Sequence, residues 1–458
     1  MNGPTTPIDE LRRDLPGDVL VTDPDIMAGY RRDRADLVSA GTPVAVARPV
    51  LTEQVSDIMR WASRHGVTVV PRGAGTGLAG GANAIDGCVI VCLERMTALR
   101  ELNATDQVAV AEAGVINADL ERAARQHGLF YPPDPGSFEI STIGGNVATN
   151  AGGMRCVKYG VTRDSVLGLE IVLADGRVLH TGARSIKNVA GLDLTSLFIG
   201  SEGTLGIITA ATLKLRPRPA TPPAVFVASF PTLPAAGHAV ALITATAVTP
   251  SMLELMDNAA INVIEDYRRM DLDRTAAVLL VGQTDGPDAL IEAERITSQC
   301  EQAGADYVAC TQDPDEAEGL IAARRLAGLA LLDSGPTVIE DIGVPRSRLA
   351  QMLAEIDQIA RAGKIRVATV GHAGDGNLHP ALLLDDTEPG TRDHALAVAE
   401  AICRAALACG GTVTGEHGVG ILKRGWLAAQ LDDTALDVHH RIKAALDPHG
   451  LLNPGRAW

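Results

Sequence analysis

The sequence predicts an α+β protein of at least two domains, and three observations support this prediction. The first half alternates short β-branched runs with glycine-rich loops and two amphipathic helices. Prolines then cluster at residues 217–223, directly after the apolar run Ile207–Leu215, and such density indicates a linker. The second half alternates helix-period segments with strands, which predicts an antiparallel sheet with helices on one face.

The two predicted helices of the first half have clear ends. Thr52–His65 carries an apolar stripe and stops at Gly66, and Asn117–His127 begins with Asn117 as the expected N-cap. Asp175-Gly176 predicts a hairpin turn between the last two strands before the linker. The predicted strands are Val67–Val70, Cys88–Leu93, Gln107–Glu112, Leu169–Leu173, Val178–Thr181 and Ile207–Leu215.

The second half is expected to contain four long helices, five strands and a final helix in the tail 434–458. The expected helices are Pro287–Ala303, Asp315–Leu331, Pro345–Ala362 and Arg392–Cys409. The expected strands are Ala277–Gly282, Tyr307–Cys310, Thr337–Ile342, Arg366–Val370 and Ala381–Leu384.

Composition excludes several classes of function. The chain has 458 residues and a net charge of -16, which disfavours nucleic acid or an anionic lipid surface as the main partner. No run of 18 uncharged apolar residues exists, so no transmembrane segment is expected, and the N-terminus lacks a signal peptide's apolar core. A cytoplasmic location is expected, with peripheral attachment to the inner face of the membrane as an alternative.

Seven cysteines are present, and none forms a CxxC pair. The odd number and the apolar surroundings favour buried, reduced thiols, and the spacing disfavours an iron–sulfur cluster within this chain.

The first glycine-rich run, residues 71–81, contains Gly75, Gly77 and Gly80 in the spacing GxGxxG. In a dinucleotide-binding Rossmann fold this motif opens a helix, whereas here another strand follows, so a Rossmann fold is disfavoured. The loop still suits a pyrophosphate, because consecutive glycines let backbone N–H groups surround an anion. Arg72 or Thr76 could add contacts.

Two further runs, 144–153 and 200–206, repeat this pattern beside apolar strands. A single run could be a surface turn. Three runs within 135 residues are better explained by backbone pressed against a large flat ligand.

Two motifs, 371–379 and 415–420, contain three histidines framed by glycines. His372 and His379 are seven residues apart, which suits a turn leading into a strand. Imidazoles at both ends of such a turn can converge on one ion, and Glu416 would supply an oxygen ligand. Asp375 is expected to shape the turn.

With these motifs the chain resembles the vanillyl-alcohol oxidase and p-cresol methylhydroxylase superfamily. The resemblance lies in residues 71–81, 132–135, 143–153 and 187–206, in this order. Within the superfamily the chain is similar, over about residues 40–458, to glycolate oxidase flavin subunits, D-lactate dehydrogenases and D-2-hydroxyglutarate dehydrogenases. The resemblance implies FAD between two α+β subdomains, under a substrate-binding cap that belongs to the C-terminal half. The expected division is an N-terminal segment 1–39, an FAD-binding domain 40–219 and a cap with a helical tail 220–458.

The resemblance also assigns residues. Relatives that attach FAD covalently often use a histidine in the first glycine loop, and residues 71–81 contain none, so noncovalent FAD is expected. The cofactor-binding residues it implies are Arg72, Gly73, Ala74, Gly75, Thr76, Gly77, Leu78, Pro135, Gly136, Thr142, Gly144, Gly145, Asn146, Ala148, Thr149, Asn150, Gly153, Gly203, Gly206, Ile207, Ile208 and Asn453.

In the resembled dehydrogenases two histidines and a glutamate hold a divalent metal, often zinc. The matching residues here are His372, His379 and Glu416, and the histidine that follows, His417, matches the general base. Arg324 stands where the family places the arginine that binds the substrate carboxylate, for which a guanidinium fork is suited.

Two positions depart from the 2-hydroxyglutarate enzymes. Where those enzymes carry polar residues this chain has Ile339 and Ala381, so a small or apolar D-2-hydroxy acid of the glycolate or D-lactate type is favoured. The alternatives are a flavin-dependent non-redox ether-lipid synthase of the same superfamily and a flavin-carrying subunit that only relays electrons. The electron acceptor stays open among a quinone, an electron-transfer flavoprotein, an iron–sulfur subunit and oxygen.

Overall fold

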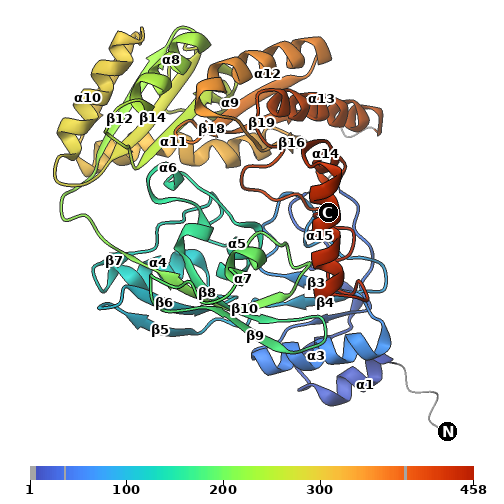
Figure 1. Cartoon of the computed structure of the whole chain (residues 1–458). Coiled ribbons are helices and arrows are strands. Elements are labelled where there is room, and N and C mark those ends of the chain that lie inside the picture. Colours follow the sequence, from blue (N-terminus) through green and yellow to red (C-terminus); the bar gives the residue numbers. More distant parts are fainter. Residues whose placement is uncertain (1–6, 36–37, 386–388) are drawn as a thin grey trace. The chain divides into compact units, whose positions relative to one another are not determined.

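A computed structural model describes residues 7–35, 38–385 and 389–458 and divides the chain into two compact units (Figure 1). Unit 1 comprises residues 1–151, 161–218 and 416–458, and unit 2 comprises residues 152–160 and 219–415. One passage between the units, at 218/219, lies one residue before the expected domain boundary at 219/220. The chain returns to unit 1 at 415/416, within the segment expected as the cap and its tail.

Unit 1 contains a small sheet of order β1-β2-β4-β3, in which β2, β4 and β3 run parallel. Its strands are β1 Leu20–Val21, β2 Ala45–Ala47, β3 Val69–Arg72 and β4 Val89–Cys92. The helix α3, Thr52–His65, matches the predicted bounds and ends at Gly66, whose φ of 64° suits glycine. Its apolar stripe, including Val55, Ile58 and Trp61, packs in one core with the sheet and with Leu11 of α1, Pro7–Asp14.

A second, antiparallel sheet of unit 1 has the order β5-β6-β10-β8-β9. Its strands are β5 Leu99–Asn103, β6 Val108–Glu112, β8 Val166–Val172, β9 Val178–Gly182 and β10 Ile207–Lys214. The hairpin predicted at Asp175-Gly176 joins β8 to β9. The helices beside it are α4 Asn117–Arg125, α5 Ile143–Thr149, α7 Leu194–Phe198 and, from the tail, α15 Asp433–Leu446.

In unit 1 one local expectation is corrected, and one helix was not predicted. The N-cap of α4 is Ile116, not Asn117, because Asn117 is already the first residue of the helix. The Asn117 Nδ2 donates to the carbonyl of Pro133 at 3.1 Å. Part of the second glycine run forms the helix α5, capped by Thr142, which accepts the N–H of Gly145 at 3.2 Å.

Unit 2 is built on an antiparallel sheet of order β15-β12-β14-β13-β18-β19-β16, and β17 pairs with β19. Its strands are β12 Ala224–Phe230, β13 Met252–Asp257, β14 Val278–Thr284, β15 Tyr307–Thr311, β16 Thr337–Ile339, β17 Ile342–Gly343, β18 Arg366–His372 and β19 Asn377–Leu383. The predicted antiparallel sheet is thereby confirmed.

The expectation that the helices of this sheet lie on one face needs a correction. Helices α9, Asn258–Tyr267, and α11, Pro314–Asp333, share a core with alternate strand residues such as Val225 and Val370. The other helices contact the same strands outside that core, and Figure 1 shows them as a separate row. They are α8 Leu233–Thr244, α10 Ala289–Gln302, α12 Leu349–Gly363 and α13 Pro389–Ala408. The physical reason is visible in β12, whose seven residues are all buried, so both faces of the sheet need a cover.

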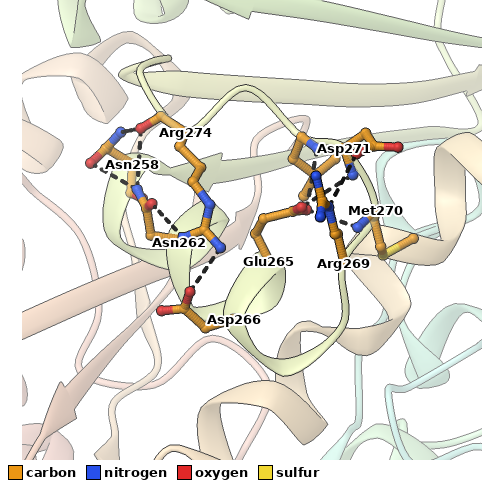
Figure 2. Close-up of polar contacts among 9 residues, drawn as sticks. Asn258, Asn262, Glu265, Asp266, Arg269, Met270, Asp271 and Arg274 are labelled. Carbon is orange, nitrogen blue, oxygen red and sulfur yellow. Dashed lines mark hydrogen bonds and ion pairs between the residues drawn. The ribbon is translucent and has the colours of Figure 1, made fainter.

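The turn after α9 is closed by a buried carboxylate (Figure 2). Glu265 accepts the backbone N–H groups of Met270, Asp271 and Leu272 at 2.9, 3.2 and 3.2 Å. Its side chain thus serves the backbone alone. Among the described residues, no helix combines the length and apolarity that a membrane crossing requires.

Candidate functional site

The first glycine run connects β3 to β4 without a helix, as its sequence predicts. At Gly73 and Gly75 a side chain would collide with neighbouring atoms of unit 1, so only glycine fits there. A Cβ on Gly73 would lie 2.4 Å from Thr142 Oγ1, and one on Gly75 would lie 1.9 Å from Arg72 Nη2. Gly75 also has a φ of +72°, which favours glycine. The loop therefore exposes backbone close to the Arg72 guanidinium.

Several buried polar atoms near these runs have no hydrogen-bond partner among the residues that the structure describes. They are Arg72 Nη1, Ser141 Oγ, Asn146 Nδ2 and Ser201 Oγ. Buried donors without partners are costly unless a ligand satisfies them. These atoms, together with the glycine backbone, fit the oxygen-rich pyrophosphate and ribityl chain of FAD. We call residues 71–81, 141–150 and 200–206 the glycine cradle.

Close packing fixes the other two runs of the cradle. A Cβ on Gly144 would lie 2.6 Å from that of Ala113, and one on Gly203 would lie 2.8 Å from the Pro71 ring. Gly206 is limited in the same way by Ile171, 2.5 Å away. These glycines serve the packing of unit 1, so part of the glycine signal in the sequence has a structural origin.

Glu202, in the third run, holds the loop that follows His417. Its carboxylate accepts the N–H groups of Val419 and Gly420 at 2.7 and 2.8 Å. Burial raises the pKa of Glu202, and the two N–H groups oppose that rise by stabilising the charged form. Asn453 reinforces the arrangement by donating to the carbonyls of Gly81 and Glu202. The tail is thereby tied to the glycine cradle within unit 1.

In unit 2 the hairpin β18–β19 brings His372 and His379 together, as the sequence predicts. Val370 pairs with His379, and His372 lies two residues beyond Val370 on the same strand, so both imidazoles project from one face. Their ring centroids are 5.1 Å apart in an edge-on arrangement, and both residues are buried. Gly376 closes the turn with a φ of +81°. Asp375 lies in this turn, with its N–H directed to the His372 carbonyl at 3.3 Å.

Each of these histidines has a fully buried carboxylate at its Nδ1. Glu254 is the strand partner of His372, and its Oε1 lies 2.8 Å from the His372 Nδ1. Asp341 Oδ1 lies 3.7 Å from the His379 Nδ1. Carboxylates at this position are typical of metal-binding histidines, because they orient the ring and leave Nε2 for the ion. The donor set of this histidine pair thus fits a divalent metal.

Arg324 lies on α11 beside the same carboxylate. Its Nε is 2.7 Å from Glu254 Oε2, an ion pair whose angle falls outside that of a hydrogen bond. The Arg324 side chain is 11% exposed. Arg325, its neighbour, instead pairs with Glu318 at the surface. The carboxylate-binding role of Arg324 stays a prediction.

Glu416 and His417 begin the last segment of unit 1, directly after Gly415. Within unit 2, Asp341 holds the residues before them, because its Oδ2 accepts Thr414 Oγ1 and the Gly415 N–H, each at 2.8 Å. His417 Nε2 lies 3.9 Å from Glu416 Oε1. The ligand and base roles of these two residues stay predictions.

The remaining predicted cofactor residues belong to unit 1 with one exception. Gly153 lies in the segment 152–160, which joins unit 2. Pro135 and Gly136 lie in the irregular stretch before α5, and Ile207 and Ile208 begin β10. Their individual contacts to a cofactor also stay predictions.

Sequence reasoning missed Glu254, Asp341 and the role of Glu202. Glu254 lies within the buried strand Met252–Asp257, and Asp341 lies between the buried residues Glu340 and Ile342. A charged residue inside an otherwise apolar stretch is the signal that could have found Glu254 and Asp341, since such charges are buried only with partners.

Comparisons with known proteins agree with this description. A family model for an FAD binding domain matches residues 43–182, and one for the C-terminal domain of FAD linked oxidases matches residues 221–457. The chain is 43% identical to glycolate oxidase subunit GlcD of Bacillus subtilis, over 91% of this chain and 89% of that protein. It is 36% identical to a D-lactate dehydrogenase of Archaeoglobus fulgidus, over 90% of both chains.

Solved structures support the fold. The structure of p-cresol methylhydroxylase with substrate bound matches with a TM-score of 0.84 and 17% identity, over 98% of this chain and 96% of that chain. An alkyldihydroxyacetonephosphate synthase matches with a TM-score of 0.74 and 20% identity, over 98% and 84%. The two family models and these relatives show that the chain belongs to the FAD-linked oxidases, and that it is an FAD-dependent oxidoreductase.

Proposed function

We propose that this chain oxidises a small D-2-hydroxy acid, of the glycolate or D-lactate type, to the 2-oxo acid, with FAD as the hydride acceptor. The observation that carries the proposal is the group formed by His372, His379 and Arg324 on one side of the unit 2 sheet, with Glu254 in contact with two of them. A histidine pair whose donors fit a metal, beside a largely buried guanidinium, suits a substrate with a hydroxyl next to a carboxylate. The names of the relatives, glycolate oxidase subunit and D-lactate dehydrogenase, support the same substrate class.

In this proposal His372, His379 and Glu416 hold a divalent metal, with zinc as the first candidate. The metal would lower the pKa of the substrate 2-hydroxyl. Support for Glu416 comes from the chain itself. Consecutive Cα atoms are about 3.8 Å apart, and Gly415 is held by Asp341, the carboxylate that also faces His379. Glu416 is therefore the next residue after one that Asp341 binds beside His379.

The other steps use residues of this chain. The guanidinium of Arg324 binds the substrate carboxylate and fixes carbon 2. His417 takes the hydroxyl proton, since an imidazole accepts protons near neutral pH. FAD, which the glycine cradle would hold, would accept the hydride from carbon 2, so the products would be a 2-oxo acid, a proton on His417 and reduced flavin.

The residues at positions 339 and 381 favour a substrate with one carboxylate. Ile339 and Ala381 are cross-strand partners, and both pack in the apolar core of unit 2. Neither side chain can pair with a second carboxylate, so a four- or five-carbon diacid would be held poorly.

Rapid anaerobic mixing tests the proposal. D-Lactate or glycolate should bleach the oxidised flavin, and L-lactate and D-2-hydroxyglutarate should do so far more slowly. The ether-lipid synthase alternative predicts no net reduction, and an electron-relay subunit predicts none with any hydroxy acid. A flavin that stays oxidised with the whole panel would refute the proposed function.

We also propose that FAD is bound noncovalently, since residues 71–81 contain no histidine. Acid precipitation should release the flavin into the supernatant, and flavin retained by the precipitate would refute this. The reduced flavin then needs an acceptor outside the chain. No two of the seven cysteines have the CxxC spacing of a cluster site, so we propose a quinone, an electron-transfer flavoprotein or a separate iron–sulfur subunit as the acceptor.

A further inference from the structure

We propose that Glu254 is a shared positioning residue, through which one buried carboxylate holds both the metal ligand His372 and the substrate arginine Arg324. This inference rests on the proposed function and extends it to a residue outside the sequence motifs. The two oxygens of Glu254 serve different partners: Oε1 faces His372 Nδ1 at 2.8 Å, and Oε2 faces Arg324 Nε at 2.7 Å.

The contact with His372 selects a tautomer. An ionised carboxylate only accepts hydrogen bonds, so the His372 Nδ1 must carry the proton, and Nε2 keeps its lone pair. A metal ligand requires this form. Glu254 is the residue directly opposite His372 in the β13–β18 ladder, so the backbone register itself sets the contact.

The contact with Glu254 orients the Arg324 guanidinium and leaves most of its N–H donors available. Arginine has five N–H donors, and Glu254 faces only the one on Nε. The four donors on the two Nη atoms stay available for a substrate carboxylate. The buried negative charge also compensates Arg324 before substrate arrives, in a site where both side chains are nearly excluded from solvent.

Glutamine at position 254 cannot serve both partners. Its single amide oxygen can replace only one of the two carboxylate oxygens, and its NH₂ group then faces the N–H of the other partner, donor against donor. If the NH₂ group faces His372, the other tautomer is favoured and Nε2 is blocked. Glu254→Gln should therefore disturb metal binding and carboxylate binding together, although it changes neither ligand.

The test measures both affinities in the FAD-loaded protein. Zinc affinity is measured by competition with a chromophoric chelator, and carboxylate affinity by oxalate titration of the oxidised flavin spectrum. Loss of a partner behind a metal-binding histidine typically costs 10–100-fold in affinity, so we expect zinc to bind about 10–100-fold more weakly in Glu254→Gln. We expect oxalate, titrated into the zinc-saturated protein, to bind about tenfold more weakly.

Glu265→Gln is the matched control. Glu265 is also a buried carboxylate of unit 2, but it serves only the backbone of the turn in Figure 2. This variant should lower Tm and leave the zinc and oxalate affinities unchanged. Glu254→Asp guards against misfolding of the glutamine variant. It keeps the charge but is one methylene shorter, so it should retain one contact and lose the other.

A double-mutant cycle separates direct from indirect effects. Arg324→Lys alone should weaken oxalate binding, and Glu254→Gln added to it should weaken oxalate little further while still weakening zinc. The shared role is refuted if Glu254→Gln leaves either affinity at the wild-type value. A wild-type protein that binds no zinc would instead refute the proposed metal site, and the oxalate measurements would still test Glu254 against Arg324.

Discussion

The glycine cradle of unit 1 and the histidine pair of unit 2 are built in different ways. In the cradle, missing side chains create the space, and at Gly73 or Gly75 a single added carbon would meet another atom within 2.4 Å. Around His372 and His379 the essential parts are side chains, with the buried acids Glu254 and Asp341 at the Nδ1 atoms. We therefore expect the glycine cradle to lose its ligand when a side-chain atom is added, and the histidine pair to lose its ligand when a buried charge is removed.

This difference explains what each region can recognise. A backbone cradle offers many weak donors over a long surface, which suits a large cofactor that stays bound. A few buried charges at fixed positions suit a small substrate whose hydroxyl and carboxylate must be placed accurately. The predictions below test whether the two regions can be damaged separately.

The largest effect is expected at His417. Changing His417→Asn should slow flavin reduction by about 10²–10⁴-fold, because asparagine keeps similar bulk but cannot accept a proton at neutral pH. FAD and zinc contents should stay normal, which places the damage in chemistry and not in assembly. The exposed His449, changed to Asn, is the matched control and should leave the rate unchanged. Wild-type reduction rates in His417→Asn would show that another group is the base.

Metal removal should impair the function of the histidine pair and leave FAD binding by the glycine cradle unchanged. Treatment with a strong chelator should reduce turnover by about a hundredfold, the usual scale of metal-assisted charge stabilisation, while FAD stays bound. Zinc should restore activity and magnesium should not, since imidazole ligands favour zinc. Full turnover by protein verified as metal-free by elemental analysis would contradict the metal assignment.

The smallest effect is expected from one added carbon in the cradle. Gly75→Ala should weaken FAD binding by about tenfold, because the new methyl group displaces the Arg72 guanidinium and the backbone has a positive φ. Gly87→Ala is a close control, with a φ of +75° and nothing within 4 Å of the new Cβ. It should cost about 1 kcal/mol of stability and no FAD affinity. Equal FAD loss in both variants would mean that backbone strain alone, and not Arg72, is responsible.

The elements that could be predicted from the sequence are those whose bounds are set by local sequence signals. α3 has the predicted bounds because its apolar stripe and Gly66 are local signals. The histidine pair was predicted because two imidazoles at the ends of a glycine turn have few other arrangements. α5 was missed because its glycines argue against a helix, and only close packing of Gly144 on Ala113 requires them there. Glu254 was missed because its meaning depends on β13 pairing with β18, more than 110 residues later.

The course of the chain through the two units also limits how this protein can be divided. The chain passes between the units after residues 151, 160, 218 and 415. A cut in the proline-rich linker therefore yields no complete unit, since Leu452 belongs to the core of unit 1 and Met154 packs in that of unit 2. An exchange of unit 2 between relatives must therefore bring residues 152–160 with it and leave 416–458 behind, because no single gene segment encodes the whole of either unit.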